Sequence, residues 1–255
     1  MNVENGNPVS YWLNLNKEKT AKLNDFIGSE IKLAWTGNIN CINCGKSIRK
    51  TYGQGFCYDC FRDSPSAAPC IVRPEICEAH LGKGRDPEWE EKHHNQPHKV
   101  YLAQTSSIKV GVTRSTQIPT RWIDQGAWRA IVIAETPYRA LAGKLEVELK
   151  QYISDRTDWR KMLIDDRGDE NITEMIDDLC AFLPEDLAKY CVEKDLMTFK
   201  YPVSNYPAKV KSIKLEDVKE IKEKLTGIRG QYLYFNESNV INLRKYSGYE
   251  VELTT

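Results

Sequence analysis

The stretch from His98 to Ile153 constrains the fold most, because its apolar residues change period several times within one short segment. VYLA and IKVGV are two apolar and β-branched runs joined by QTSS, which predicts an antiparallel hairpin. Residues 116–127 then predict a short helix with Pro119 in its first turn. The run AIVIA, at residues 130–134, is typical of a strand that is covered on both faces.

A longer helix is predicted from Pro137 onwards. Its apolar residues recur every fourth position and form one stripe, at Leu141, Leu145, Leu149 and Ile153. Glu146 and Glu148 lie on the two flanks of that stripe. Periodicity alone does not show which of the two glutamates faces a functional site.

The order of hairpin, helix with an arginine, strand, and helix with a glutamate resembles the GIY-YIG nuclease superfamily. On this resemblance Tyr101 in VYL matches the GIY tyrosine, and KVG at residues 109–111 stands where the family has YIG. KVGVT is similar to phage-type branches that have KIG or KVG followed by threonine. Arg121 matches the family's arginine, and Glu146 matches its metal-binding glutamate better than Glu148 does.

The resemblance implies phosphodiester hydrolysis, which needs an activated water, a cation on the phosphate and help for the leaving oxygen. Glu146 would hold one Mg²⁺ that keeps most of its waters, and Tyr101 would position or deprotonate the attacking water. Arg121, near the amino end of its helix, would bind the phosphate with two hydrogen bonds. Lys109 supplies charge but lacks the hydroxyl of the tyrosine that it replaces.

Each of these residues also has an ordinary structural explanation. Tyr101 could be a packing residue of the hairpin, Glu146 could be solvated, and Arg121 could pair with Asp124. The basic and aromatic residues nearby predict a patch that holds a nucleic-acid backbone and stacks bases: Arg114, Trp122, Trp128, Arg129 and Arg139. In the other interpretation the tryptophans belong to the core and the arginines are solvated.

Two C-x2-C pairs predict a structural zinc site. Cys41 and Cys44 are separated from Cys57 and Cys60 by twelve residues, with Gly45 after the first pair and Gly55 before the second. Each pair can turn both thiolates onto one ion, and the metal supplies order that so short a segment cannot obtain from a core. Since four protein ligands leave no open position, we expect this zinc to be architectural.

A looser cluster follows and contains all four histidines of the chain. Cys70, Cys77, His94 and His98 are the quartet that we expect to hold a second zinc. The alternative is a loop with solvated histidines. The segment from Gly82 to His98 is polar and punctuated, which predicts a loop or linker.

A second resemblance covers nearly the whole chain. The segments CINCGKSIRKTYGQGFCYDCF, KVGVTRSTQIPTRWIDQGA, SDRTDWRKML, YPVSNYPAKVKSIKL and GIRGQYLYF are similar to a bacterial family of unknown function. In that family a cysteine-rich module precedes a GIY-YIG-like block. The resemblance implies an architecture but no established activity.

The amino-acid composition limits which binding partners and which cellular compartment we expect. Lys+Arg and Asp+Glu both number 36, so any nucleic-acid site must be a local patch. No run approaches the roughly 18 apolar residues of a membrane span, and the amino-terminal residues lack a signal-peptide pattern. Six of the eight cysteines fall between Cys41 and Cys77, which in a reducing compartment favours metal over disulfides. We therefore expect a cytoplasmic protein.

We expect an α+β fold made of a zinc knuckle module, a GIY-YIG-like small α/β domain and a small β-barrel or sandwich. The expected parts are amino-terminal strands that pair with the carboxyl-terminal β module (1–38), a zinc module (39–97), the GIY-YIG-like domain (98–165), a helical linker (166–199) and the β module (200–255). The function expected first is a zinc-stabilised, Mg²⁺-dependent endonuclease. The alternatives are a non-catalytic nucleic-acid or ribonucleoprotein binder and, with less support, a protein-interaction adaptor.

Overall fold

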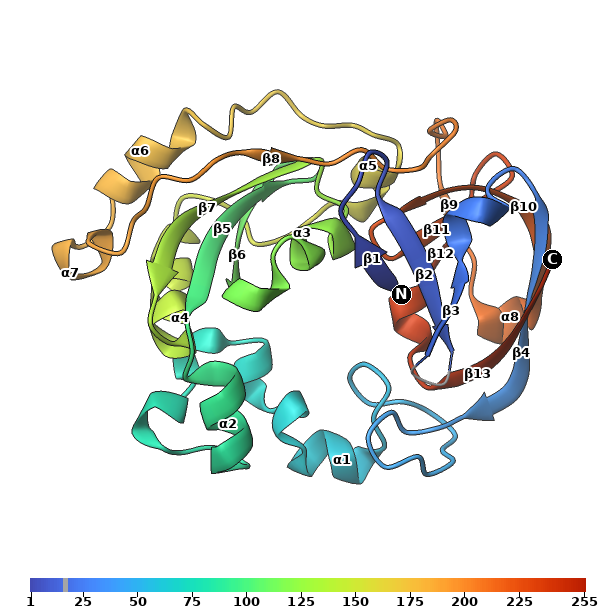
Figure 1. The fold of residues 1–255 in the computed structure, drawn as a ribbon, viewed down its shortest axis with the longest axis horizontal. Coiled ribbons are helices and arrows are strands. Elements are labelled where there is room, and N and C mark those ends of the chain that lie inside the picture. Colours follow the sequence, from blue (N-terminus) through green and yellow to red (C-terminus); the bar gives the residue numbers. More distant parts are fainter. Residues whose placement is uncertain (16–17) are drawn as a thin grey trace.

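The computed structural model describes residues 1–15 and 18–255, and mixes helices with several sheets. The expected α+β class is confirmed. Figure 1 shows the chain arranged around a central space, with one sheet and its helices on the left and the longer sheet on the right. The segment that carries the six clustered cysteines runs along the bottom between them.

The four-stranded sheet has the order β6-β5-β7-β8. β5 (His98–Gln104) pairs antiparallel with β6 (Ile108–Arg114) and with β7 (Arg129–Thr136), and the short β8 (Met197–Thr198) pairs with β7. The predicted hairpin is therefore confirmed. Residues 130–134 of β7 are all buried, as expected for a strand covered on both faces.

Helices cover the two faces of this sheet. α4 (Arg139–Leu149) places the predicted leucine stripe against Val100 and Leu102 of β5. The opposite face, with Tyr101 and Ala103, packs against α3 (Thr120–Asp124) and the longer sheet. Alternation along β5 separates these two sets, since successive side chains of a strand point to opposite faces.

The helix predicted over residues 116–127 is divided into two pieces. A 3-10 turn, η6 (Ser115–Gln117), comes first, and α3 begins only after Pro119. A residue that precedes proline avoids the helical conformation, and Ile118 is extended, with φ −91° and ψ 133°. Proline therefore interrupts the helix instead of lying inside its first turn.

The longer sheet has six strands in the order β13-β4-β10-β11-β12-β9. They are β4 (Glu30–Ile39), β9 (Lys211–Ser212), β10 (Glu220–Arg229), β11 (Tyr232–Phe235), β12 (Asn239–Asn242) and β13 (Tyr249–Thr254). β4 pairs with both β10 and β13, which joins the amino-terminal part to the carboxyl-terminal strands. A separate three-stranded sheet contains β1 (Asn2–Glu4), β2 (Ser10–Leu15) and β3 (Glu18–Lys22). Among the described residues these sheets do not close into a barrel.

Short helices and turns make up the remainder. The α-helices are α1 (Tyr58–Asp63), α2 (Pro87–His94), α5 (Trp159–Leu163), α6 (Met175–Ala181), α7 (Glu185–Ala188) and α8 (Leu215–Val218), and the 3-10 turns are η1 (Leu23–Phe26), η2 (Pro65–Ala67), η3 (Pro69–Ile71), η4 (Pro74–Ile76), η5 (Ala79–Leu81) and η7 (Leu243–Tyr246). A disulfide joins Cys180 to Cys191. Within residues 1–15 and 18–255, no helix combines the length and the apolar character that crossing a bilayer requires.

The loop predicted from Gly82 to His98 is wrong in part, because α2 forms within it. The side chain of Asp86 accepts a hydrogen bond from the Trp89 N–H at 3.1 Å, and Pro87 occupies the first helical position. Both features stabilise a helix amino terminus. The helix matters below because it carries two of the candidate metal ligands.

Candidate metal centres and phosphate site

The four cysteines of the two C-x2-C pairs converge on one point. Their sulfurs all lie within 4.8 Å of one another, and Cys44 Sγ lies 3.9 Å from Cys57 Sγ. A tetrahedral zinc with Zn–S bonds of about 2.3 Å holds its sulfurs about 3.8 Å apart, so these residues fit the ion. The group could hold one zinc ion, with no ligand position left for a substrate.

Local backbone geometry brings these sulfurs together. Cys57 caps α1, and its sulfur accepts a hydrogen bond from the Cys60 N–H at 3.4 Å. Burial disfavours the Cys41 thiolate, but backbone donors at Cys44 and Cys57 lower its pKa to about 6. Gly55 has a φ of +106° and lies against Ser247, so a side chain there would collide with the neighbouring turn. The thiolate of Cys41, the form that binds metal, is thus favoured before any ion arrives.

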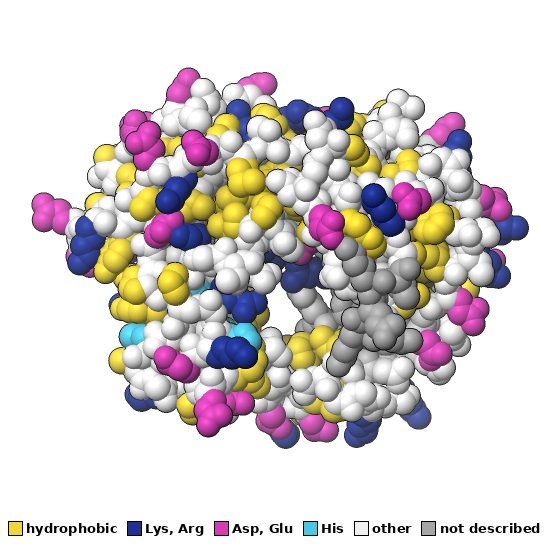
Figure 2. Space-filling view, in the orientation of Figure 1, with side chains coloured by type: hydrophobic (Ala, Val, Ile, Leu, Met, Phe, Trp, Pro, Cys, Tyr) yellow, Lys and Arg dark blue, Asp and Glu magenta, His cyan; other side chains and the backbone are white. Residues whose placement is uncertain are grey.

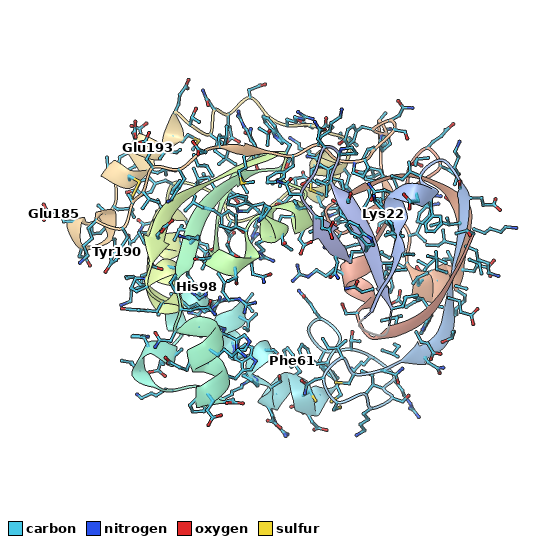
Figure 3. All side chains as sticks on the ribbon, viewed as in Figure 1. Lys22, Phe61, His98, Glu185, Tyr190 and Glu193 are labelled. Atoms are coloured by element: carbon cyan, nitrogen blue, oxygen red, sulfur yellow. A yellow bond between two sulfur atoms is a disulfide. The ribbon has the colours of Figure 1, made fainter. Side chains whose placement is uncertain are left out.

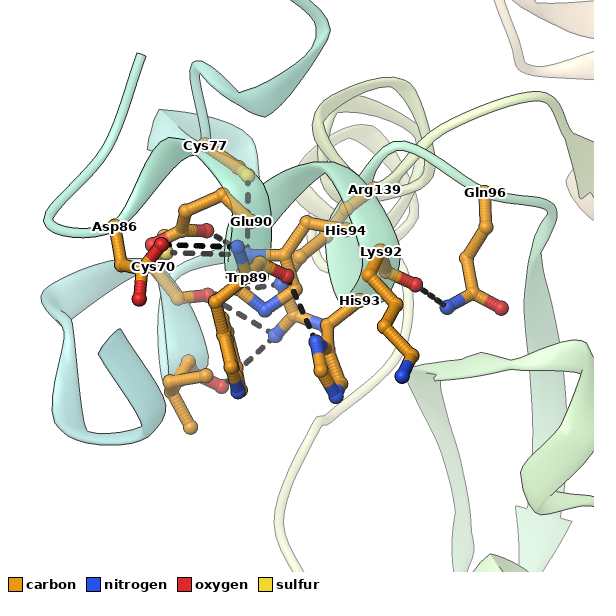
Figure 4. A network of polar contacts seen from close by, with 11 residues as sticks. Cys70, Cys77, Asp86, Trp89, Glu90, Lys92, His93, His94, Gln96 and Arg139 are labelled. Carbon is orange, nitrogen blue, oxygen red and sulfur yellow. Dashed lines mark hydrogen bonds and ion pairs between the residues drawn. The ribbon is translucent and has the colours of Figure 1, made fainter. Parts of the chain in front are cut away.

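A second group joins Cys70, Cys77, Glu90 and His94. These residues are buried, and their ligand atoms also lie within 4.8 Å of one another (Figure 4). His94 Nδ1 lies 3.6 Å from Cys77 Sγ and 3.9 Å from Cys70 Sγ, and it contacts the Glu90 carboxylate. Gly84 makes room for Glu90, because an added Cβ would lie 2.4 Å from Glu90 Cγ.

This group differs at one position from the predicted quartet, since Glu90 stands where we expected His98. Glu90 and His94 are four residues apart on α2 and therefore share one face of that helix. His98 lies beyond α2, at the start of β5, where Figure 3 labels it. Its Nδ1 lies 2.7 Å from the Gln96 carbonyl oxygen, and burial lowers the pKa of His98 to about 4. The spacing E-x3-H could have indicated Glu90 as a ligand. It brings Glu90 and His94 together only if residues 87–94 form a helix.

In the central sheet, Tyr101 faces the glycine of the KVG segment. Tyr101 pairs with Gly111 and Ala103 pairs with Lys109, so all four positions lie on the α3 face. An added Cβ on Gly111 would lie 2.6 Å from Tyr101 Oη, so glycine is what makes room for the phenol. Gln125 Nε2 donates to Tyr101 Oη at 2.6 Å. Burial raises the pKa of Tyr101, and the neighbouring Arg121 offsets part of that rise.

Lys109 is a nearly buried cation. Its side chain is on the edge strand β6, the residue is 9% exposed, and it forms no salt bridge with any residue that the structure describes. Burial and, after it, the charge of Arg121 lower the pKa of Lys109 to about 8, although Asp155 and Glu146 act in the opposite direction. Two cations are therefore held near each other beside acidic groups that neither of them contacts directly.

Glu146 approaches this place from the flank of α4. Burial raises the pKa of its carboxyl, whereas Lys150, whose Nζ lies 3.3 Å away, lowers it. The charge of Glu146 acts on Tyr101 and on Lys109 although α4 covers the other face of the sheet. Since β6 is the edge strand, we infer that this charge acts around that edge of the sheet. Glu148 instead bonds Gln151 at 2.8 Å, so Glu146 is the glutamate that lies near the other candidates.

Most residues of the predicted nucleic-acid patch have internal roles. Trp122 is 2% exposed and packs edge-on against Tyr101, so it has no free face for a base. Arg129 donates to Gln104 Oε1 at 2.6 Å and lies over the Trp128 ring. Arg139 donates to the Cys70 carbonyl oxygen. Arg114, at the end of β6, forms no salt bridge within the described part of the chain.

Arg244 is a nearby cation that the sequence did not single out. It lies in η7 and donates to Gln54 Oε1, in the cysteine segment, at 2.8 Å. Burial and the charge of Arg121 both lower the pKa of Arg244. Folding brings Arg121 and Arg244 together through Gln231. Its side chain donates to Asp124 of α3 at 2.6 Å, and its carbonyl oxygen accepts a hydrogen bond from the Leu243 N–H of η7 at 2.9 Å.

The opening around which the chain is arranged persists when side chains are drawn. Figure 2 shows a hollow in the middle of this face, with Lys and Arg side chains at its rim. α3 and the cysteine segment lie on opposite sides of the central space in Figure 1. The hollow is therefore an accessible place that residues of several regions border.

Comparison with known proteins gives a family and no activity. No curated protein and no solved structure matches this chain. Residues 28–251 match the model of a family described as "Protein of unknown function (DUF2797)". That match includes the cysteine segment, the central sheet and most of the longer sheet. The chain therefore belongs to the DUF2797 family of proteins of unknown function.

Proposed function

We propose that this protein is a zinc-stabilised phosphodiesterase that acts on nucleic acid, with Tyr101, Lys109, Arg121 and Glu146 at its reaction site. The observation that carries the proposal is the nearly buried Lys109, which lies beside Arg121 and forms no salt bridge with a described residue. A buried cation is costly unless an anion accompanies it. A phosphate diester would supply that anion, and the hydrogen-bond geometry of a guanidinium matches phosphate oxygens.

Each residue then has a role set by its surroundings. Lys109 and Arg121 would neutralise the phosphate at the reaction site. The nearby Arg244 would contact the adjacent part of the nucleic-acid backbone. Tyr101 Oη accepts the hydrogen bond from Gln125, and among the described residues no acceptor takes its own proton, which it can therefore donate. Because burial raises the pKa of Tyr101, the phenol stays protonated near neutral pH and would orient the water or phosphate by donating to it.

Glu146 is the proposed ligand for Mg²⁺. Its donor set suits the ion, since Mg²⁺ takes one or two carboxylates and keeps several waters. Asp155 provides a second carboxylate close by, and Lys150, which lies 3.3 Å from Glu146 and 3.2 Å from Asp155, can pair with either. Bound there, Mg²⁺ would polarise the phosphate and stabilise the charge on the leaving oxygen.

The test is a cleavage assay on single- and double-stranded DNA and RNA with Mg²⁺ or Mn²⁺. We expect Glu146→Ala to abolish cutting while binding persists, and Arg121→Ala to weaken binding and reduce its salt dependence. Glu148→Ala is the matched control, because Glu148 lies on the same helix but bonds Gln151. Equal cutting by Glu146→Ala and Glu148→Ala would exclude the proposed metal ligand.

A second function, a non-catalytic nucleic-acid binder, is favoured by one specific observation. Tyr101 is 1% exposed, and its hydroxyl is enclosed between Gly111 and Gln125. A covered phenol can support a phosphate-binding surface without reacting. Salt-sensitive binding that Arg121→Ala weakens, with no cleavage of any substrate, would select this function. Absence of binding to every nucleic acid would exclude both.

A further inference from the structure

The group of Cys70, Cys77, Glu90 and His94 would carry negative charge that a bound cation can neutralise. Two thiolates and a carboxylate would repel one another inside the protein, where water does not screen them. One divalent ion together with the Arg139 guanidinium, which donates to the Cys70 carbonyl oxygen at 3.0 Å, balances these charges. A cavity of about 360 Å³ reaches Cys70, Cys77 and Glu90, and gives an ion a route to them.

The same group is built directly against α4. Arg139, the first residue of that helix, also donates to the Ile71 carbonyl oxygen at 3.0 Å. The Tyr138 ring stacks on His80, with ring centroids 4.4 Å apart. The backbone contact is closest at Gly143, where an added Cβ would lie 2.2 Å from the Glu75 nitrogen and 2.4 Å from the Pro74 carbonyl carbon. The segment between Cys70 and Cys77 therefore cannot shift without displacing α4.

Glu146 lies on the same face of α4 as these contacts. Positions 139, 143 and 146 are spaced by four and three residues, so they follow one another along one side of a helix. The charge of Glu75, which lies in η4 between Cys70 and Cys77, acts on the Glu146 carboxyl. The placement of Glu146 thus depends on how η4 is held.

We propose that Cys70, Cys77, Glu90 and His94 bind a second zinc ion, and that its occupancy fixes α4 and thereby positions Glu146. This inference rests on the proposed function only for the consequence at Glu146. Zinc accepts thiolate, imidazole and carboxylate ligands, and four protein ligands make the centre a brace rather than a reaction site. Loss of this ion would free η3 and η4 and loosen the helix that they support.

The test combines zinc analysis with hydrogen exchange of the full-length protein. The wild-type protein should contain two zinc ions per chain, whereas Cys77→Ser should contain one, and its α4 amides (139–149) should exchange severalfold faster. Cys44→Ser is the matched control, since it removes the other zinc and should leave α4 exchange unchanged. Glu90→Gln keeps the shape of the side chain and should release one zinc to a chelator sooner than the wild type does.

Each outcome decides the proposal. One zinc per wild-type chain, even after growth and purification with zinc, would overturn the second centre. Two zinc ions with the same α4 exchange in wild type, Cys77→Ser and Glu90→Gln would overturn the coupling to Glu146. If the wild-type protein cuts no nucleic acid, the proposed function fails, but zinc content and α4 exchange still judge the second centre. If Cys77→Ser does not fold, Glu90→Gln and chelation of the wild-type protein provide the same comparison.

Discussion

Replacement of Lys109 by methionine should stabilise the protein while it weakens phosphate binding. Burial lowers the pKa of Lys109 from 10.5 to about 8. Between these values the unfolded chain holds a proton that the folded chain does not, so the free energy of unfolding rises with pH across this window. Below about pH 8 Lys109 is charged in both states, so the full cost of burying its charge lowers the stability of the folded protein. The difference of 10.5 − 8, about 2.5 pH units, corresponds to about 3 kcal/mol.

Little of this cost is removed by solvent, because Lys109 is only 9% exposed. Methionine keeps the length of the side chain and removes the charge, so Lys109→Met should gain up to about 3 kcal/mol at about pH 7. The gain should shrink towards zero at about pH 10, where the folded wild type has already lost the proton.

Urea unfolding at the two pH values, at fixed zinc concentration, measures this directly. Lys144→Met is the matched control, because Lys144 is an exposed lysine of α4 and its replacement should change stability little. Added oligonucleotide should stabilise the wild type more than Lys109→Met. A Lys109→Met variant less stable than the wild type at about pH 7 would refute the reasoning, because the charge would then be satisfied within the protein itself.

Three further predictions concern single contacts. Cys57→Ser should remove one zinc ion and expose the segment around α1 to proteolysis, which metal analysis and limited digestion would detect; an intact zinc content would exclude the four-cysteine centre. Gly111→Ala should destabilise the protein by about 1–3 kcal/mol in urea unfolding, since the added Cβ would meet Tyr101 Oη at 2.6 Å; unchanged stability would mean that the phenol moves freely. Asp165→Ala should lower the free energy of unfolding by about 3 kcal/mol, because the fully buried Arg229, which lies 2.6 Å from the Asp165 carboxylate, would lose its partner. An unchanged thermal unfolding temperature would contradict this.

The parts of the site that the sequence could predict are those set by local chemistry. Two C-x2-C pairs and their glycines determine a ligand set within one short segment, so folding elsewhere does not alter it. The strands of the central sheet follow in the same way from apolar runs of fixed period. The second ligand set was harder to predict from the sequence, because Glu90 becomes a neighbour of His94 only once α2 forms. Asp86 and Pro87 signalled that helix, but the polar composition of the segment concealed it.

The sequence could not predict the direction in which each side chain points. Trp122, Arg129 and Arg139 are close in the sequence to the predicted site residues, yet the fold directs them into the core, along the sheet and onto the cysteine segment. Arg244 was missed for the opposite reason, since more than a hundred residues separate it from Arg121 in the chain. Contacts of this kind depend on how the two sheets pack, which no local pattern encodes.

A neutral composition does not exclude an anionic partner once the pairing of the charges is considered. Many charged residues are matched within the fold, as Lys99 is with Glu135 and Arg229 with Asp165. Lys109, Arg114, Arg121 and Arg244 form no salt bridge with the residues that the structure describes. Arg121 and Arg244 repel each other across two regions of the chain, and Gln54 holds one of them in place. The carboxylate of Asp124 offsets part of this repulsion in the free protein. An anion bound between the two guanidinium groups would relieve the remainder. The fold thus places Lys109, Arg121 and Arg244 close enough for their charges to interact, although the chain as a whole has no net charge.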